Sequence, residues 1–169
     1  MVRVEAVLDT WKTVREDTAL AVEEFPADDF GYKPTADVMS FGDIANHILQ
    51  AGHALTGLLL DGTENFATPE FRPSLKKYID ELPGRDTPAE LAALLRLEMA
   101  KRCAALAAQP AEFFSGMVTR MDGLPVTRLE MLQFIKEHEL THRSQLFLYL
   151  RLKGLVPATT RRRQAKAKA

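Results

Sequence analysis

The residues best suited to chemistry in this sequence are three of its four histidines. His138 and His142 stand four positions apart, and His47 lies much earlier in the chain. Two histidines at this spacing are stacked neighbours on one helix face, so both imidazoles can reach a single ion. Neutral imidazole is a common ligand of zinc, nickel and other divalent metals. The three residues are therefore predicted to hold one divalent metal ion.

The helical periodicity decides which histidines face the core. A helix advances about 100° per residue, which places His138 and His142 on or within about 20° of the apolar arc of their helix. His47 lies on the flank of the apolar arc of an earlier helix. His53, on that same helix, points about 160° away from Leu55. We therefore expect His53 on the solvent side and outside the site.

Three inward-facing histidines together favour a metal site, whereas a single one would not. A single histidine on an apolar face is more often a hydrogen-bonded core residue than a ligand. Three inward imidazoles each need a partner, however, and protonating them in a core is costly. One divalent cation satisfies all three. Because three nitrogen ligands leave at least one coordination position open, bound water or a bound thiol can be activated there, as in catalytic metal sites.

Three other side chains deserve a prediction of their own. Gln145 shares the face of the two helical ligands, so it either touches the open position or a substrate, or is a polar residue at one end of a bundle. Glu139 lies at the edge of the inward arc and is either a base or an acceptor behind a ligand, or a partner in an interhelical salt bridge. Cys103, at helical spacing from Met99, is expected to be a buried thiol rather than a nucleophile.

The segment from His138 to His142 also matches a well-known protease motif. It reads His-Glu-Leu-Thr-His, which fits the H-E-x-x-H pattern of zinc metalloproteases. In those enzymes the third ligand usually follows the motif. No His, Asp, Glu or Cys follows His142 in this chain. We interpret the match as coincidence.

Four long segments must position these residues. Apolar residues recur at helical spacing over about 2–24, 41–60, 88–109 and 128–153. Capping boxes open three of these segments, at Ser40–Asp43, Thr87–Glu90 and Thr127–Glu130. The long connection 63–86 contains three prolines and is expected to hold a short helical turn around 74–82, and Asp122-Gly123 indicates a hairpin. The fold class is therefore all-α, a four-helix bundle with a long crossover connection between helices two and three.

Composition sets the domain boundaries and excludes several partners. Residues 1–157 suit one bundle domain, and residues 158–169 form a basic tail that we expect to be disordered. Five of the 22 basic residues lie in that tail, which leaves 17 against 23 acidic residues in the body. An acidic body makes nucleic acid an unfavourable partner. No apolar run predicts a membrane span, and a single cysteine fits a reducing cytoplasm.

Over about residues 2–157 the chain resembles the DinB-like family of metal-binding four-helix bundles. Phe30-Gly31-Tyr32-Lys33-Pro34 is similar to the loop after the family's first helix, and the segment from Met39 to Ile48 is similar to its second-helix entry, which contains a ligand histidine. The segment His138-Glu139-Leu140-Thr141-His142-Arg143-Ser144-Gln145 resembles the family's H-x-x-x-H-R-G-Q stretch, with Ser144 in place of the common glycine.

The resemblance implies a three-histidine site for zinc or nickel, formed by His47, His138 and His142, and a homodimer. Some relatives are thiol-dependent transferases or isomerases. We expect a metal-dependent enzyme that activates a low-molecular-weight thiol or water for transfer to, or hydrolysis of, a small electrophile. The alternative is a non-enzymatic, stress-related module that binds a metal or another ligand. Family membership alone does not decide between them.

Overall fold

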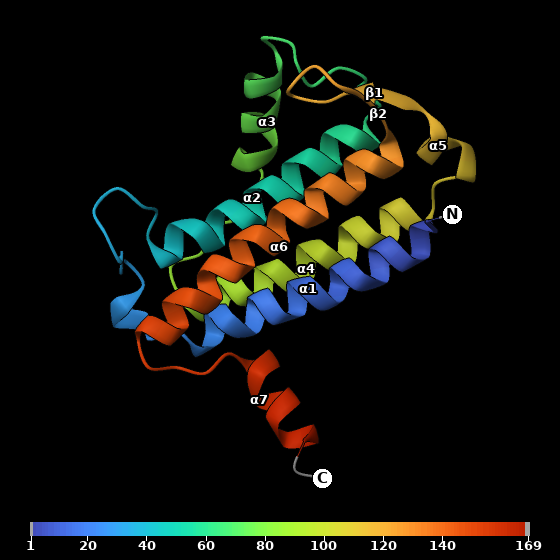
Figure 1. Cartoon of the computed structure of the whole chain (residues 1–169). Coiled ribbons are helices and arrows are strands. Elements are labelled where there is room, and N and C mark those ends of the chain that lie inside the picture. Colours follow the sequence, from blue (N-terminus) through green and yellow to red (C-terminus); the bar gives the residue numbers. More distant parts are fainter. Residues whose placement is uncertain (1, 168–169) are drawn as a thin grey trace.

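Four long helices packed side by side form the body of the protein in a computed structural model that describes residues 2–167 (Figure 1). These helices are α1 (Val4–Glu24), α2 (Phe41–Leu60), α4 (Pro88–Ala107) and α6 (Arg128–Leu152). Helices α1 and α2 each contact both α4 and α6. Helices α2 and α4 run in the same direction (Figure 1), so the chain between them must return along the bundle. The predicted all-α bundle with a long crossover is confirmed.

Local sequence fixes where these helices begin. All three predicted capping boxes are present, with the side chains of Ser40, Thr87 and Thr127 accepting from the backbone N–H three residues later. The acidic residue at that third position bonds back to the cap in each case. Two otherwise unpaired N–H groups are thereby satisfied at each helix start. The position of each cap matters because it sets the helical register of the candidate ligands.

The connections between the long helices contain further structure. A 3₁₀ turn, η1 (Ala27–Asp29), follows α1, and the crossover holds α3 (Phe71–Asp80), which begins three residues before the turn that we expected around 74–82. Helix α5 (Ala111–Ser115) precedes the predicted hairpin. In that hairpin β1 (Met117–Thr119) pairs antiparallel with β2 (Pro125–Thr127). Helix α3 stands over the middle of α2, and the hairpin lies at the end of the bundle where α2 ends and α6 begins (Figure 1).

The core of the bundle divides into two apolar clusters with a polar layer between them. One cluster includes Trp11, Leu59 and Met131, and the other includes Phe41 and Leu95. Along α6, the buried apolar residues of the first cluster end at position 135 and those of the second begin at 146. The histidine pair of α6 falls in this interval. Bundles commonly place metal and cofactor sites among facing helices in this way.

The basic tail differs from the disordered segment that we expected. Residues from Ala158 to Lys166 form helix α7, which packs against α1. Arg161 pairs with Glu24, and Arg162 pairs with Asp17. Composition alone could not reveal that acidic groups on α1 face these arginines. Among the described residues, no helix combines the length and the apolar character that crossing a membrane requires.

Candidate metal centre

The three predicted histidines meet between α2 and α6. Nε2 of His138 lies 3.1 Å from Nε2 of His47 and 3.2 Å from Nε2 of His142. One nitrogen from each ring lies within 4.8 Å of the others. All three residues are half-buried. Within residues 2–167 this is the one group of three or more His, Cys, Asp or Glu side chains whose ligand atoms come so close.

The spacing of these nitrogens fits a small divalent ion. Two nitrogens bound to one tetrahedral zinc ion at about 2.0–2.1 Å would lie about 3.3–3.4 Å apart. The two shortest nitrogen separations here are 3.1 and 3.2 Å. Neutral imidazoles facing one another at this distance without an ion would have to share protons or remain unpaired in a desolvated site. The donor set therefore suits a small divalent ion, and three nitrogen ligands leave a coordination position for a non-protein ligand.

The protein environment favours the neutral form of these rings. Burial, together with the neighbouring His142 and His47, lowers the pKa of His138 to about 4. Burial and His142 also lower the pKa of His47 below its ordinary value. A neutral imidazole has a lone pair to donate, whereas a protonated one cannot bind a metal. At neutral pH these two side chains are thus ready to act as ligands.

Gln145 contacts a candidate ligand. Its Oε1 lies 2.7 Å from Nδ1 of His142, one turn earlier on α6. Because an amide oxygen can only accept, this contact favours a proton on Nδ1 and leaves the lone pair on Nε2, which faces the other histidines. A contact between Gln145 and a substrate stays a prediction. What the geometry supports directly is orientation of a ligand ring.

Glu139 points away from the histidines and into the interface with α1. Its carboxylate is 2% exposed and accepts from Nε1 of Trp11 at 2.5 Å and from Oγ1 of Thr18 at 3.2 Å. Arg15 donates to it twice, from Nε at 2.7 Å and from Nη2 at 2.8 Å. Of the two expectations for Glu139, the interhelical salt bridge is confirmed, although it is buried rather than at the surface. Its partner Arg15 was not identified from the sequence.

The family model described as the DinB family matches residues 1–168. This chain belongs to the DinB family. The uncharacterized protein YjoA of Bacillus subtilis (strain 168) is 27% identical over 142 residues, which cover 83% of this chain and 84% of YjoA.

Two solved structures share the DinB fold of this chain. The crystal structure of the DinB-like protein YjoA from Bacillus subtilis has a TM-score of 0.67 and 24% identity, covering 88% of this chain and 92% of that one. The mycothiol-dependent maleylpyruvate isomerase has a TM-score of 0.63 and 18% identity, covering 86% of this chain and 61% of that one. At these identities the likeness establishes the fold.

The fourth histidine of this DinB-family chain is buried, so the prediction that His53 faces solvent was wrong. Its side chain is packed against α4, where Nδ1 lies 2.8 Å from Oε2 of Glu98, and Nη2 of Arg102 lies 3.2 Å from Nδ1 and 3.1 Å from Nε2. Its ring also lies near that of Tyr78 on α3. Helix α2 is covered on this side by α3 and α4, whereas the prediction assumed a single buried face. His53 remains separate from the three-histidine cluster.

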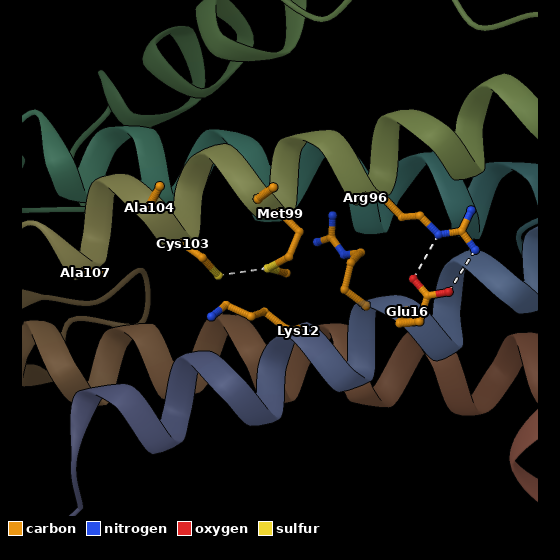
Figure 2. Close-up of a pocket in the computed structure, with 9 residues that line it drawn as sticks. Lys12, Glu16, Arg96, Met99, Cys103, Ala104 and Ala107 are labelled. Carbon is orange, nitrogen blue, oxygen red and sulfur yellow. Dashed lines mark hydrogen bonds and ion pairs between the residues drawn. The ribbon is translucent and has the colours of Figure 1, made fainter.

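A groove of about 430 Å³ runs between α1 and α4, away from the histidines (Figure 2). Cys103 lies in this groove with its Sγ 3.2 Å from Sδ of Met99, and Arg96 pairs with Glu16 farther along. The Cys103 side chain is 3% exposed, and burial raises the pKa of its thiol. A raised pKa reduces the thiolate fraction and therefore the reactivity. The expectation of a buried, unreactive thiol is consistent with this environment.

Proposed function

We propose that this protein is a metal-dependent enzyme that transfers the sulfur of a low-molecular-weight thiol to a small electrophile. The observation that carries the proposal is the convergence of three imidazole nitrogens from His47, His138 and His142 beside a cavity of about 190 Å³. His47 and His138 both line that cavity. A ligand cluster that opens onto a cavity is typical of a catalytic metal site, since a structural site is closed by a fourth protein ligand.

The residues of the chain would hold and tune the ion. His47, His138 and His142 would bind it as neutral ligands, and Gln145 would keep the ring of His142 in the required tautomer. When bound, a divalent ion lowers the pKa of a coordinated thiol and so supplies thiolate at neutral pH. Thiol chemistry is favoured over hydrolysis because one protein of the same fold is named a mycothiol-dependent isomerase. That comparison supports a low-molecular-weight thiol as one reactant and does not identify the electrophile.

Metal content is the first test. Protein purified without a histidine tag is expected to contain about one zinc or nickel per chain by elemental analysis, and His142→Ala is expected to lose it. His53→Ala is the matched control, because it removes a histidine of α2 that lies outside the cluster. If neither the parent protein nor protein reconstituted with zinc or nickel holds a metal, the proposed function fails.

Activity is the second test. The metal-loaded protein is mixed with cysteine, glutathione or mycothiol and with 1-chloro-2,4-dinitrobenzene. In the reaction the thiol releases its proton, its sulfur bonds to the ring carbon, and chloride leaves with the bonding electrons. The expected result is a rate with at least one thiol that falls at least a hundredfold in His142→Ala and is unchanged in His53→Ala. Equal rates in the parent protein and His142→Ala would contradict a role for the site.

A further inference from the structure

The cavity beside the histidines has walls from four parts of the chain. Helix α2 contributes Leu55, helix α3 contributes three side chains, the hairpin contributes one and helix α6 contributes one. These six large apolar side chains are Leu55, Phe71, Leu75, Ile79, Met121 and Phe134, and Ala51 of α2 also lines the cavity. Helix α3 therefore has a role in the site, since its residues at four-residue spacing face the cavity. A bundle without this crossover helix would leave the histidines facing open solvent on that side.

Charge is absent from the cavity lining. No Lys, Arg, Asp or Glu is among the residues that line it, all of which lie within the described part of the chain. Gln50 is the one polar side chain there apart from His47 and His138. The cation Arg120 lies over the ring of Phe134 but pairs with Asp122 and does not line the cavity. In metal-free protein, a carboxylate entering this space would lose water without gaining a cationic side chain as partner, which is costly.

The size of the cavity sets the size of the group that it can hold. A dry cavity of about 150 Å³ lined by Leu, Ile and Phe is known to bind benzene. The cavity here measures about 190 Å³ and is mainly apolar, although it is open to solvent and its lining also includes His47, Gln50 and His138. It can therefore hold one six-membered ring with a small substituent. The Gln50 amide offers a single hydrogen-bond donor or acceptor to such a substituent.

We propose that this cavity binds an uncharged, ring-sized apolar group of the electrophilic substrate and holds it against His47 and His138. The proposal rests on the proposed function, because it names the class of the second reactant at that site. It also distinguishes this chain from a protein built for a small dicarboxylate. The substrate class expected here is a neutral aromatic or alicyclic electrophile.

Binding of three probes tests the proposal without any turnover. Toluene, benzoate and maleate are titrated into the full chain labelled at the methyl groups of Met and Ile, and the shifts are followed by NMR. Toluene is expected to shift the methyl signals of Met121 and Ile79. In metal-free protein benzoate, which has the same ring and one negative charge, is expected to bind at least tenfold more weakly, and maleate is expected to leave these signals unmoved.

A pair of variants locates the binding. Leu75→Trp fills the cavity from α3 and is expected to weaken toluene binding at least tenfold. Leu97→Trp is the matched control, because Leu97 is 50% exposed on α4 and does not line the cavity. Equal affinity of metal-free protein for toluene and benzoate, or toluene shifts that survive Leu75→Trp, would overturn the proposal.

The outcome can be separated from that of the proposed function. The titration is run on zinc-loaded protein and on protein treated with a chelator. Toluene binding in both forms supports the cavity assignment even if the thiol-transfer assay gives no rate. A protein that holds zinc and transfers a thiol but does not bind toluene would refute this inference and leave the proposed function standing.

Discussion

Replacing Glu139 by glutamine tests whether this residue acts on the metal or on the fold. In the structure its carboxylate is an acceptor in four hydrogen bonds, from Trp11, Thr18 and twice from Arg15. The amide nitrogen of glutamine can only donate, so at least one of these donors loses its acceptor. The guanidinium of Arg15, whose side chain is 3% exposed, would also be left without its counter-charge.

The expected cost follows from that burial. Removing one partner of a buried ion pair typically costs about 3–5 kcal/mol, because the remaining charge is desolvated and unpaired. For a domain of this size, 1 kcal/mol corresponds to roughly 2–4 °C in the melting temperature. Glu139→Gln is therefore expected to lower the melting temperature by about 6–20 °C. Thermal unfolding followed by circular dichroism measures this directly, on metal-free protein so that ion binding does not contribute.

Two controls make the result specific. Glu137→Gln changes an exposed glutamate of the same helix, and its effect is expected to stay within about 0.5 kcal/mol. The double variant Arg15→Met, Glu139→Leu removes both charges together and is expected to cost much less than the two single changes combined. A folded Glu139→Gln protein with an unchanged melting temperature and no thiol-transfer rate would refute this reasoning. Glu139 would then have to act at the metal.

Three further predictions concern the site and its walls. Gln145→Leu is expected to weaken zinc binding about 10–100-fold in a chelator competition without lowering the melting temperature, because it removes the acceptor that orients a ligand ring. Since the folded pKa of His138 is about 4 and its ordinary value is 6.5, the unfolded state binds more protons between these values. The free energy of unfolding of metal-free protein, measured with urea, is therefore expected to be constant above about pH 6.5 and to fall towards pH 4. In His138→Gln this fall is expected to be smaller. Gly57→Ala would place a methyl group against the ring of Tyr78 on α3. It is therefore expected to lower the free energy of unfolding by about 1–3 kcal/mol and to weaken toluene binding. Gly84→Ala is the control, because the space around that residue is open, and it is expected to have neither effect.

Periodicity and capping were sufficient to predict the bundle. The caps at Ser40, Thr87 and Thr127 mark helix starts through local chemistry that needs no tertiary information. The histidine cluster was predictable for a related reason, since two of its members share one helix face and the third flanks an apolar arc. Helix α3 was underestimated because Pro73 lies in its first turn and its apolar side chains are few. Its stability depends on packing against α2, which a local pattern does not contain.

What the sequence could not supply was the identity of the neighbour on each helix face. A helical wheel gives the direction of a side chain relative to its own helix and says nothing about which helix lies there. For this reason His53 was assigned to solvent, although α4 covers it and Glu98 bonds to it. Arg15 was overlooked because its partner is 124 residues away in the sequence. Gly52 is a weak sequence signal for a large neighbouring side chain, since any side chain at that position would overlap the Arg15 guanidinium.

The protease-like motif shows why the neighbour decides the chemistry. Adjacent residues on a helix point about 100° apart, so His138 and Glu139 cannot both face the same partner. Here His138 faces α2, where it meets His47, and Glu139 faces α1, where Arg15 and Trp11 hold it. A glutamate base must reach a water bound to the metal. Because its oxygens are directed into a different interface, we expect Glu139 not to act as such a base, and we interpret the five letters shared with metalloproteases as coincidence.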